Sequence, residues 1–360
     1  MRIVEARAWP TRLEFVRPVR TSIGEFRDRR SVLLGLTDDD GRTGYGEGAP
    51  WPGFGTETVE ESLVVLETTC GLARGMDLEA GDWPVEIALG LRNASAARAA
   101  FQGALWDLAA RRANVTLATH LARSVLPTGA GASSVVSTQA LLLAAEPEEV
   151  RAEAARAREK GFQAAKLKVG AAKLEDDVER VRAARSGLGP GLRLRADANG
   201  AWTETQAAAA LEAMAEFDLD YVEQPVAPHD VAAFVRLRQR VPVRLAVDES
   251  VATEEGALRL IGAGAASVYV LKPATLGGPA RALEIASMVR HAGAEVVFSH
   301  AFESAVGARH ALHCAAALGD ASAIHGLDTA GLFRNDVAPA VECERGEMHL
   351  DAAPGIGVSP

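Results

Sequence analysis

The sequence predicts an α/β protein in which a parallel barrel follows a smaller α+β domain. The chain has 360 residues, 48% of them hydrophobic, which is enough for a large core. From about residue 134 onward, strand-like and helix-like segments alternate with a repeat of about 25 residues, which implies a parallel sheet. Eight such strands favour closure into a barrel. An open doubly wound sheet would normally bring a GxGxxG or GxxxxGK phosphate loop, and the sequence contains neither.

The first part of the chain mixes strands and helices without that rhythm. Residues 30–48 predict a β-hairpin, because an apolar run is followed by an Asp-Asp-Asp-Gly turn and a second strand. A loop rich in glycine and proline at 51–58 precedes a predicted helix at 59–73, and another helix is expected at 95–113. These elements predict an α+β domain over about residues 1–125.

The barrel elements follow in alternation. The predicted strands cover residues 134–143, 163–169, 192–200, 219–225, 243–250, 266–273, 294–300 and 322–328. The predicted helices cover residues 146–161, 173–189, 203–217, 230–241, 253–264, 278–293 and 303–319.

The net charge and the cysteine pattern limit the kinds of partner and the cellular compartment that are expected. The net charge of −10 argues against nucleic acid and anionic membranes, so a small-molecule substrate is expected. Cys70, Cys314 and Cys343 form no CxxC pair, which is typical of a reduced, cytoplasmic protein. The N-terminal residues lack the apolar core of a signal peptide, and no run reaches about 18 apolar residues. A homo-oligomer is compatible with the sequence, which does not specify the oligomeric state.

Charged residues stand at the ends of five successive predicted strands, where barrels place their function. Each lies one strand–helix unit after the previous one, which puts all of them at the same rim. They are Lys166 and Lys168, then Asp197, Glu223, Asp248 and Lys272.

This pattern predicts a metal-assisted proton abstraction. Carboxylates from three neighbouring strands, Asp197, Glu223 and Asp248, can converge on one hard cation such as Mg²⁺. Strands two and six of an eight-strand ring face each other, so Lys168 and Lys272 would flank a ligand on the metal. A cation with two lysines suits removal of a proton next to a carboxylate. Lys166 beside Lys168 would lower the pKa of that base by like-charge repulsion.

Simpler interpretations apply to single residues. One carboxylate at a strand end is usually a helix N-cap or a solvated loop residue, and paired lysines can be surface residues. Asn199 is expected to support a ligand from behind, and Glu249 either does the same or caps the next helix. His300 ends the seventh strand, from which its side chain could reach the site. Trp51 and Phe54 pack between domains unless their loop covers the barrel mouth.

The rim motifs resemble those of the enolase superfamily, muconate-lactonizing-enzyme subgroup. They read KLK, DAN, VEQP, DES and LKP on strands two to six. The resemblance implies a capping domain over 1–125, a modified (β/α)7β TIM barrel over 126–330 and a segment over 331–360 that returns to the cap. It also implies one Mg²⁺, for which Mn²⁺ can substitute, held by Asp197, Glu223 and Asp248.

Three stretches resemble o-succinylbenzoate synthases within this subgroup: residues 46–58, 299–307 and 325–333. That resemblance implies dehydration of 2-succinyl-6-hydroxy-2,4-cyclohexadiene-1-carboxylate in menaquinone biosynthesis, through an enediolate, with Lys168 as base. N-succinylamino acid racemases and dipeptide epimerases share the scaffold and remain alternatives, as does a barrel without catalysis. The epimerases carry an Asp-x-Asp motif on the last strand, where only Asp328 is clear here, which disfavours them.

Several residues are expected to contact the substrate. Arg195, two residues before Asp197, is expected to point into the barrel and place a carboxylate. The succinyl tail would be held by the cap loops and by the segment after strand seven. The predicted contacts from these loops are Ser22, Phe54, Ser299, Glu303 and Ser304.

Overall fold

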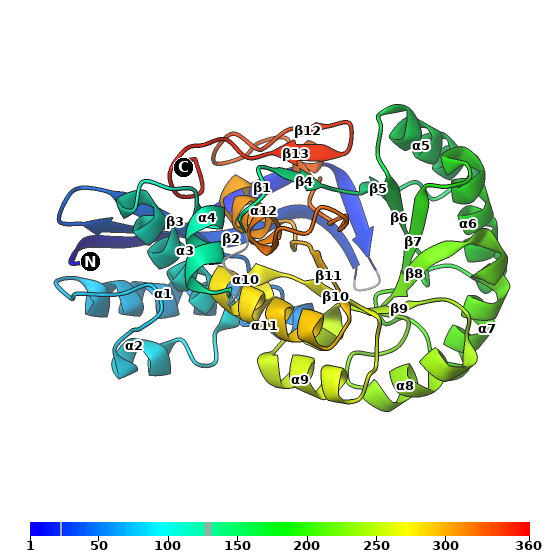
Figure 1. Ribbon diagram of the computed structural model, residues 1–360, viewed down its shortest axis with the longest axis horizontal. Helices are drawn as coiled ribbons and strands as arrows, with labels where there is room; N and C mark the ends of the chain where they lie inside the picture. Colours follow the sequence, from blue (N-terminus) through cyan, green and yellow to red (C-terminus); the bar gives the residue numbers. More distant parts are fainter. Residues whose placement is uncertain (22–23, 127–130) are drawn as a thin grey trace.

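The computed structural model describes residues 1–21, 24–126 and 131–360 (Figure 1). An antiparallel three-stranded sheet and four helices form the N-terminal part. The strands are β1 (Ile3–Thr21), β2 (Gly24–Asp38) and β3 (Thr43–Gly48), and the helices are α1 (Val59–Ala73), α2 (Val85–Gly90), α3 (Ser95–Arg112) and α4 (Leu117–Ser124). A short 3₁₀ helix, η1 (Pro52–Phe54), lies in the loop before α1.

Local sequence explains these N-terminal elements. The predicted hairpin is β2–β3, and the Asp38 carboxylate closes its turn by accepting the N–H groups of Asp40 and Arg42. Alternate glycines in β3 let α3 pack directly on the strand backbone. A Cβ at Gly44 or Gly46 would lie 2.3 or 2.0 Å from a carbonyl oxygen of α3.

The barrel is a curled, seven-stranded parallel sheet in which each strand pairs with the next one in sequence. Its strands are β5 (Ala140–Leu142), β6 (Ala164–Lys168), β7 (Arg193–Asp197), β8 (Leu219–Glu223), β9 (Leu245–Val247), β10 (Val268–Leu271) and β11 (Glu295–Phe298). Single bridges from His325 to Thr138 and from Gly326 to Ser299 connect the two edges of the sheet. The predicted fold class is therefore confirmed.

Helices cover the outer side of the curved sheet, and α10 to α12 lie toward the cap (Figure 1). They are α5 (Pro147–Glu159), α6 (Leu174–Leu188), α7 (Glu204–Met214), α8 (Val231–Arg240), α9 (Glu254–Gly262), α10 (Pro273–Leu276), α11 (Pro279–His291) and α12 (Ala305–Leu318). Short 3₁₀ helices are η2 (Ala215–Phe217), η3 (Glu249–Val251) and η4 (Ala330–Leu332). No helix in the described part of the chain is long and apolar enough to cross a membrane.

Two predicted strands differ from the structure. The segment 134–143 is not one strand, because its first half, β4 (Val135–Ser137), pairs with β13 (Glu347–His349) outside the barrel. That small antiparallel sheet also contains β12 (Cys343–Glu344). The segment 322–328 contributes only the single bridges of the barrel seam. Thr138 holds that seam, since its hydroxyl donates to the His325 carbonyl and accepts the Leu327 N–H.

Apolar side chains and the buried Arg195 fill the barrel interior beneath the rim. Inward-facing positions alternate along each strand, so the residue two before a rim residue lies one layer deeper. This deeper layer forms a separate buried cluster made of Tyr221, Ala246, Val268, Val270 and Val297. The packed layer supports the charged rim from below.

Buried charges from the cap bind the barrel loops. The Glu47 carboxylate accepts hydrogen bonds from the Ser31 hydroxyl at 2.6 Å, the Gly307 N–H at 2.9 Å and the Ser304 N–H at 3.1 Å. Glu47 thus caps the N-terminus of α12 from another domain. The Arg29 guanidinium donates to the carbonyls of the cap loop and also to Ala301 after β11.

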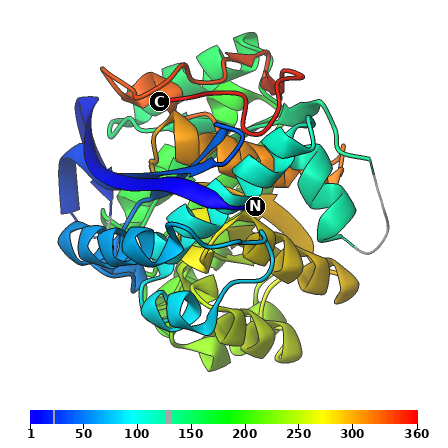
Figure 2. The ribbon, with the colours of Figure 1, turned by 90° about the vertical axis from the view of Figure 1, so that its left-hand side faces the viewer.

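The C-terminal segment also contacts the cap. The Asp107 carboxylate of α3 accepts the Ile356 N–H at 2.7 Å, and the Leu117 N–H of α4 donates to the Gly355 carbonyl at 2.7 Å. Figure 2, viewed from the cap side, shows both chain ends on that side of the molecule.

Replacing Glu47 with alanine is expected to lower the free energy of unfolding by about 3 kcal/mol, because several buried donors would lose their acceptor. Urea unfolding followed by circular dichroism measures the change. Glu60→Ala is the matched control, since Glu60 is exposed and pairs with Arg30 on the surface. Equal effects of the two substitutions would contradict the role given to Glu47.

Candidate active site

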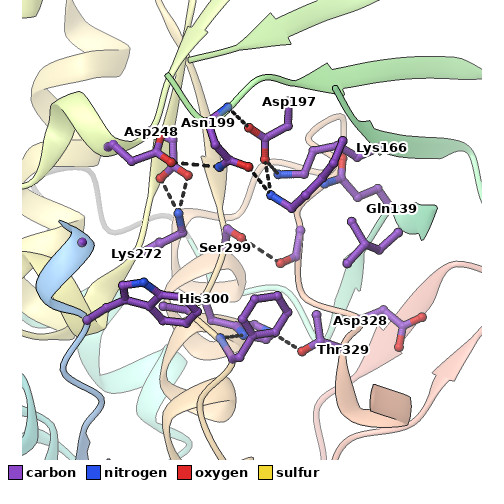
Figure 3. Close-up of a pocket in the computed structure, with 18 of the residues that line it drawn as sticks. Gln139, Lys166, Asp197, Asn199, Asp248, Lys272, Ser299, His300, Asp328 and Thr329 are labelled. Atoms are coloured by element: carbon purple, nitrogen blue, oxygen red, sulfur yellow. Dashed lines mark hydrogen bonds and ion pairs between the residues drawn. The ribbon is translucent and has the colours of Figure 1, made fainter. Parts of the chain in front are cut away.

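A cavity of about 210 Å³ lies at the carboxyl ends of the barrel strands (Figure 3). Trp51 and Gly53 of the cap loop also line it, so that loop does reach the barrel mouth. From the residues predicted by sequence, the cavity wall contains Lys166, Lys168, Asp197, Asn199, Asp248, Glu249, Lys272, Ser299 and His300.

Lys166 lies between two of the predicted ligands. Asp197 and Glu223 occupy paired positions on β7 and β8, and both are almost completely buried. The Lys166 ammonium donates to Asp197 at 3.1 Å and to both Glu223 oxygens at 3.0 Å. Asp197 thus contacts the ammonium groups of both Lys166 and Lys168.

The pKa values of this group follow from burial and charge. Burial raises the pKa of Glu223 to about 7, and repulsion from Asp197 adds to that effect. Burial acts in the same direction on Asp197, but the ammonium groups of Lys166 and Lys168 hold its pKa below the usual value. Burial would lower the pKa of Lys166, and the two carboxylates instead raise it well above that of an ordinary lysine.

Lys168 is oriented by hydrogen bonds on one side of the cavity. Its ammonium donates to Asp197 at 3.0 Å and to the Asn199 side-chain oxygen at 2.6 Å. The Asn199 amide in turn donates to Glu249 at 2.9 Å. This chain fixes the Lys168 ammonium at the cavity wall, where 20% of the side chain is exposed.

Lys272 and Asp248 form an ion pair across the cavity from that group (Figure 3). Lys272 follows β10, which is separated from β6 by three strands of the curved sheet. Burial would lower the pKa of Lys272, but Asp248 and Glu249 raise it above the ordinary value. The two rim lysines, Lys168 and Lys272, thus approach the cavity from different sides of the barrel.

The donor set fits a hard divalent cation. Asp197, Glu223 and Asp248 supply oxygen ligands, and one Glu249 oxygen is buried without a hydrogen-bond partner among the described residues. These four carboxylates outnumber the three lysine ammonium groups, so the site carries excess negative charge. A divalent cation reverses that excess and leaves a positive charge that one substrate carboxylate can neutralise.

The donor atoms of the three predicted ligands do not converge on a single point. Within the described part of the chain, the only trio of possible ligands whose donor atoms all lie within 4.8 Å of one another is Asp38, Asp39 and Asp40, on the hairpin turn. In the barrel the Lys166 ammonium stands between Asp197 and Glu223. A cation there would require small rotations of these side chains.

Three residues that were predicted to contact the substrate do not line this cavity. Arg195 points into the barrel but lies one layer below the rim, where it donates to Asp220 at 2.9 Å and to Gln139 at 2.8 Å. Glu303 is buried against the Ala301 N–H and His300, and does not line the cavity. Ser304 is fully buried as the N-cap of α12.

Two other predicted contacts are not tested. Ser22 lies outside the described residues, and the side chain of Phe54 is not described either. His300 lines the cavity as a packed residue, bonded to the Thr329 hydroxyl at 2.8 Å and to the Leu327 carbonyl at 3.1 Å.

The wall residues that the sequence analysis did not name include Gln139, Leu141, Pro228 and Thr329. Gln139 had a signal, since it is a polar residue within an apolar predicted strand. Phe302 lies in the segment after strand seven that was expected to hold the substrate, and its φ of 59° is uncommon for a bulky residue and typical of functional loops. Asp328 also lines the cavity, and burial raises its pKa. No described residue hydrogen-bonds to its carboxylate.

Both parts of the chain match known family models. Residues 149–360 match the family model described as "Enolase C-terminal domain-like", and residues 3–121 match "Mandelate racemase / muconate lactonizing enzyme, N-terminal domain". The chain belongs to the enolase superfamily, in the mandelate racemase and muconate lactonizing enzyme family.

The similar proteins include dipeptide epimerases and o-succinylbenzoate synthases. A hydrophobic dipeptide epimerase of Enterococcus faecalis is 29% identical over 100% of both chains. The crystal structure of the dipeptide epimerase from that organism, complexed with Mg and L-Leu-L-Tyr, superposes with a TM-score of 0.90 at 28% identity over 100% of both chains. An o-succinylbenzoate synthase of Mycobacterium tuberculosis is 44% identical, but over only 51% of this chain and 54% of its own. Similarity along the whole chain thus favours the epimerases.

Proposed function

We propose that the protein is a Mg²⁺-dependent epimerase that moves the α-proton of a carboxylate substrate between Lys168 and Lys272. The main support is that these two lysines lie at the ends of well-separated strands around one cavity. Each forms an ion pair with a carboxylate of the predicted ligand set. Two bases on opposite faces of one carbon are what inversion of configuration requires.

Each rim residue has a role in this reaction. Lys168 Nζ accepts the α-proton from one face, and Lys272 Nζ donates a proton to the other face. The roles exchange in the reverse direction. Asn199 and Asp248 orient the two ammonium groups. A bound Mg²⁺ supplies Lewis-acid stabilisation of the charge that develops on the substrate carboxylate.

A dipeptide is the proposed substrate, with its ammonium group at Asp328. Asp328 is a wall residue whose carboxylate accepts no hydrogen bond from the described residues, and only the more distant charges of Lys160 and His300 act on it, so its oxygens can accept from a ligand. Gly326 stands where the first aspartate of the Asp-x-Asp motif would be. A Cβ there would lie 3.1 Å from the Gln139 amide nitrogen and 3.2 Å from the Ser299 hydroxyl, which leaves little room for a second carboxylate. Asp328 alone therefore binds the ammonium.

The second candidate is o-succinylbenzoate synthase, which the 44% identity over half the chain supports. The deciding experiment offers a dipeptide panel, N-succinyl amino acids and the cyclohexadiene substrate to the same Mg²⁺-loaded protein. Epimerisation of dipeptides without dehydration supports the first proposal. Dehydration without α-proton exchange in dipeptides would replace it with the second.

Asp328→Asn is expected to lower kcat/KM for dipeptides about 10- to 100-fold, the value of one charged hydrogen bond in a partly buried site. N-succinyl amino acids lack the ammonium group, so any activity on them should be unchanged or higher. Steady-state polarimetry on both substrate types measures the difference. Asp320→Asn is the control, since Asp320 bonds only Ser322 outside the cavity. An equal loss on both substrate types would contradict ammonium binding by Asp328.

A further inference from the structure

A second cavity of about 260 Å³ adjoins the active-site cavity. It lies between β5, α5 and η4, and it shares Leu141, Asp328 and Thr329 with the first cavity. These shared residues form a common wall. A substrate whose ammonium group reaches Asp328 would therefore place the side chain of that same residue at the entrance to the second cavity.

The second cavity is lined by apolar side chains and by the exposed cations Arg156 and Lys160, besides the carboxylates of Glu153 and Asp328. Ala140, Leu142 and Phe162 form part of its inner wall. Arg156 and Lys160 stand four residues apart, at the end of α5, and are therefore neighbours on one helix face. Neither side chain forms a close ion pair with a described residue, although the attraction of Lys160 partly offsets the burial that raises the pKa of Asp328.

The single acidic residue that α5 contributes to this cavity does not cancel the two cations. Glu153 pairs with Arg17 at 3.2 Å and accepts the N–H groups of Leu143 at 2.7 Å and Ala144 at 3.0 Å. The negative charge of Glu153 is thus already paired with Arg17 and with two backbone N–H groups. A substrate side chain with an apolar stem and a terminal carboxylate would match the apolar wall residues and the two cations of this cavity.

We propose that the second cavity binds an acidic side chain on the substrate residue that carries the ammonium group, so that dipeptides beginning with glutamate or aspartate are preferred. This inference rests on the proposed function, and it names the substrate class of the same site. Asp328 binds the ammonium, while Arg156 and Lys160 bind the side-chain carboxylate beyond it. The carboxylate at the other end of the dipeptide faces the rim lysines.

The test compares Glu-Leu, Gln-Leu and Lys-Leu as substrates of the Mg²⁺-loaded full chain. Glu-Leu should exceed its isostere Gln-Leu in kcat/KM by about fivefold, as expected for partly exposed ion pairs. In Lys160→Ala and Arg156→Ala the preference should fall toward unity, and in Lys160→Glu it should invert in favour of Lys-Leu. Arg158→Glu is the matched control, because Arg158 is on the same helix but does not line the cavity, and it should keep the preference.

The two proposals fail in different ways. Equal epimerisation of all three dipeptides by the unaltered protein would overturn the acidic-side-chain inference and leave the epimerase standing. Absence of α-proton exchange with every dipeptide would overturn the epimerase. In that case calorimetric binding of Glu-Leu and Gln-Leu still tests the cavity: equal affinities overturn the inference, and tighter Glu-Leu binding that Lys160→Glu abolishes supports it.

Discussion

Replacing either rim lysine with alanine should abolish epimerisation and leave α-proton exchange for one configuration only. In D₂O the unaltered protein is expected to exchange both diastereomers of a dipeptide. Lys168→Ala and Lys272→Ala should each retain exchange with the diastereomer whose proton faces the remaining lysine. Loss of one acid–base group costs roughly 100- to 10,000-fold in rate. Proton NMR of each diastereomer, offered separately, measures both rates.

The structural cost of the two substitutions differs. Lys272 is 8% exposed, so its removal leaves Asp248 buried without its ammonium partner, whereas the Lys168 side chain is more open. Circular dichroism therefore has to accompany the kinetics. Lys173→Ala is the control, since Lys173 is an exposed residue before α6. If each variant lost exchange with both diastereomers and the unaltered protein dehydrated the cyclohexadiene substrate, one-base chemistry would replace the proposal.

The charged rim could be predicted from sequence because parallel strands repeat in both sequence and space. Lys168, Asp197 and Glu223 occupy successive paired positions on β6, β7 and β8, as their even spacing indicates. The same alternation predicted that Arg195 points inward. The alternation did not predict how far below the rim Arg195 lies, because a step of two residues along a strand moves a side chain by about 7 Å. That distance moves Arg195 from the cavity wall into the packed interior.

Contacts between distant segments could not be predicted in this way. Ser304 follows β11 at the rim, but it caps α12 and is covered by Glu47, more than 250 residues earlier. Gln139 and Thr329 reach the cavity only because the barrel seam brings the two ends of the sheet together. Neither contact leaves a periodic signal in the sequence, because each depends on the assembled cap and barrel.

Removal of divalent cations should abolish exchange and lower thermal stability, and Mg²⁺ should restore both. A ligand at 100 times its dissociation constant stabilises the folded state by about 2.7 kcal/mol, which is a measurable shift in Tm. Glu223→Gln should lose activity and most of the Mg²⁺-dependent shift, because it removes one of three oxygen ligands and leaves Lys166 with one carboxylate fewer. The barrel itself should stay folded, since its core does not depend on one ion.

The hairpin turn supplies the discriminating control for this prediction. Asp38, Asp39 and Asp40 are the trio whose donor atoms already lie close together in the described chain, and Asp39 and Asp40 are exposed. These carboxylates are expected to bind a cation weakly, because they already form ion pairs with Arg42 and Arg112. Asp40→Asn should therefore leave both the Mg²⁺-dependent Tm shift and the activity unchanged. A shift that vanished in Asp40→Asn and persisted in Glu223→Gln would place the cation in the cap and remove it from the reaction.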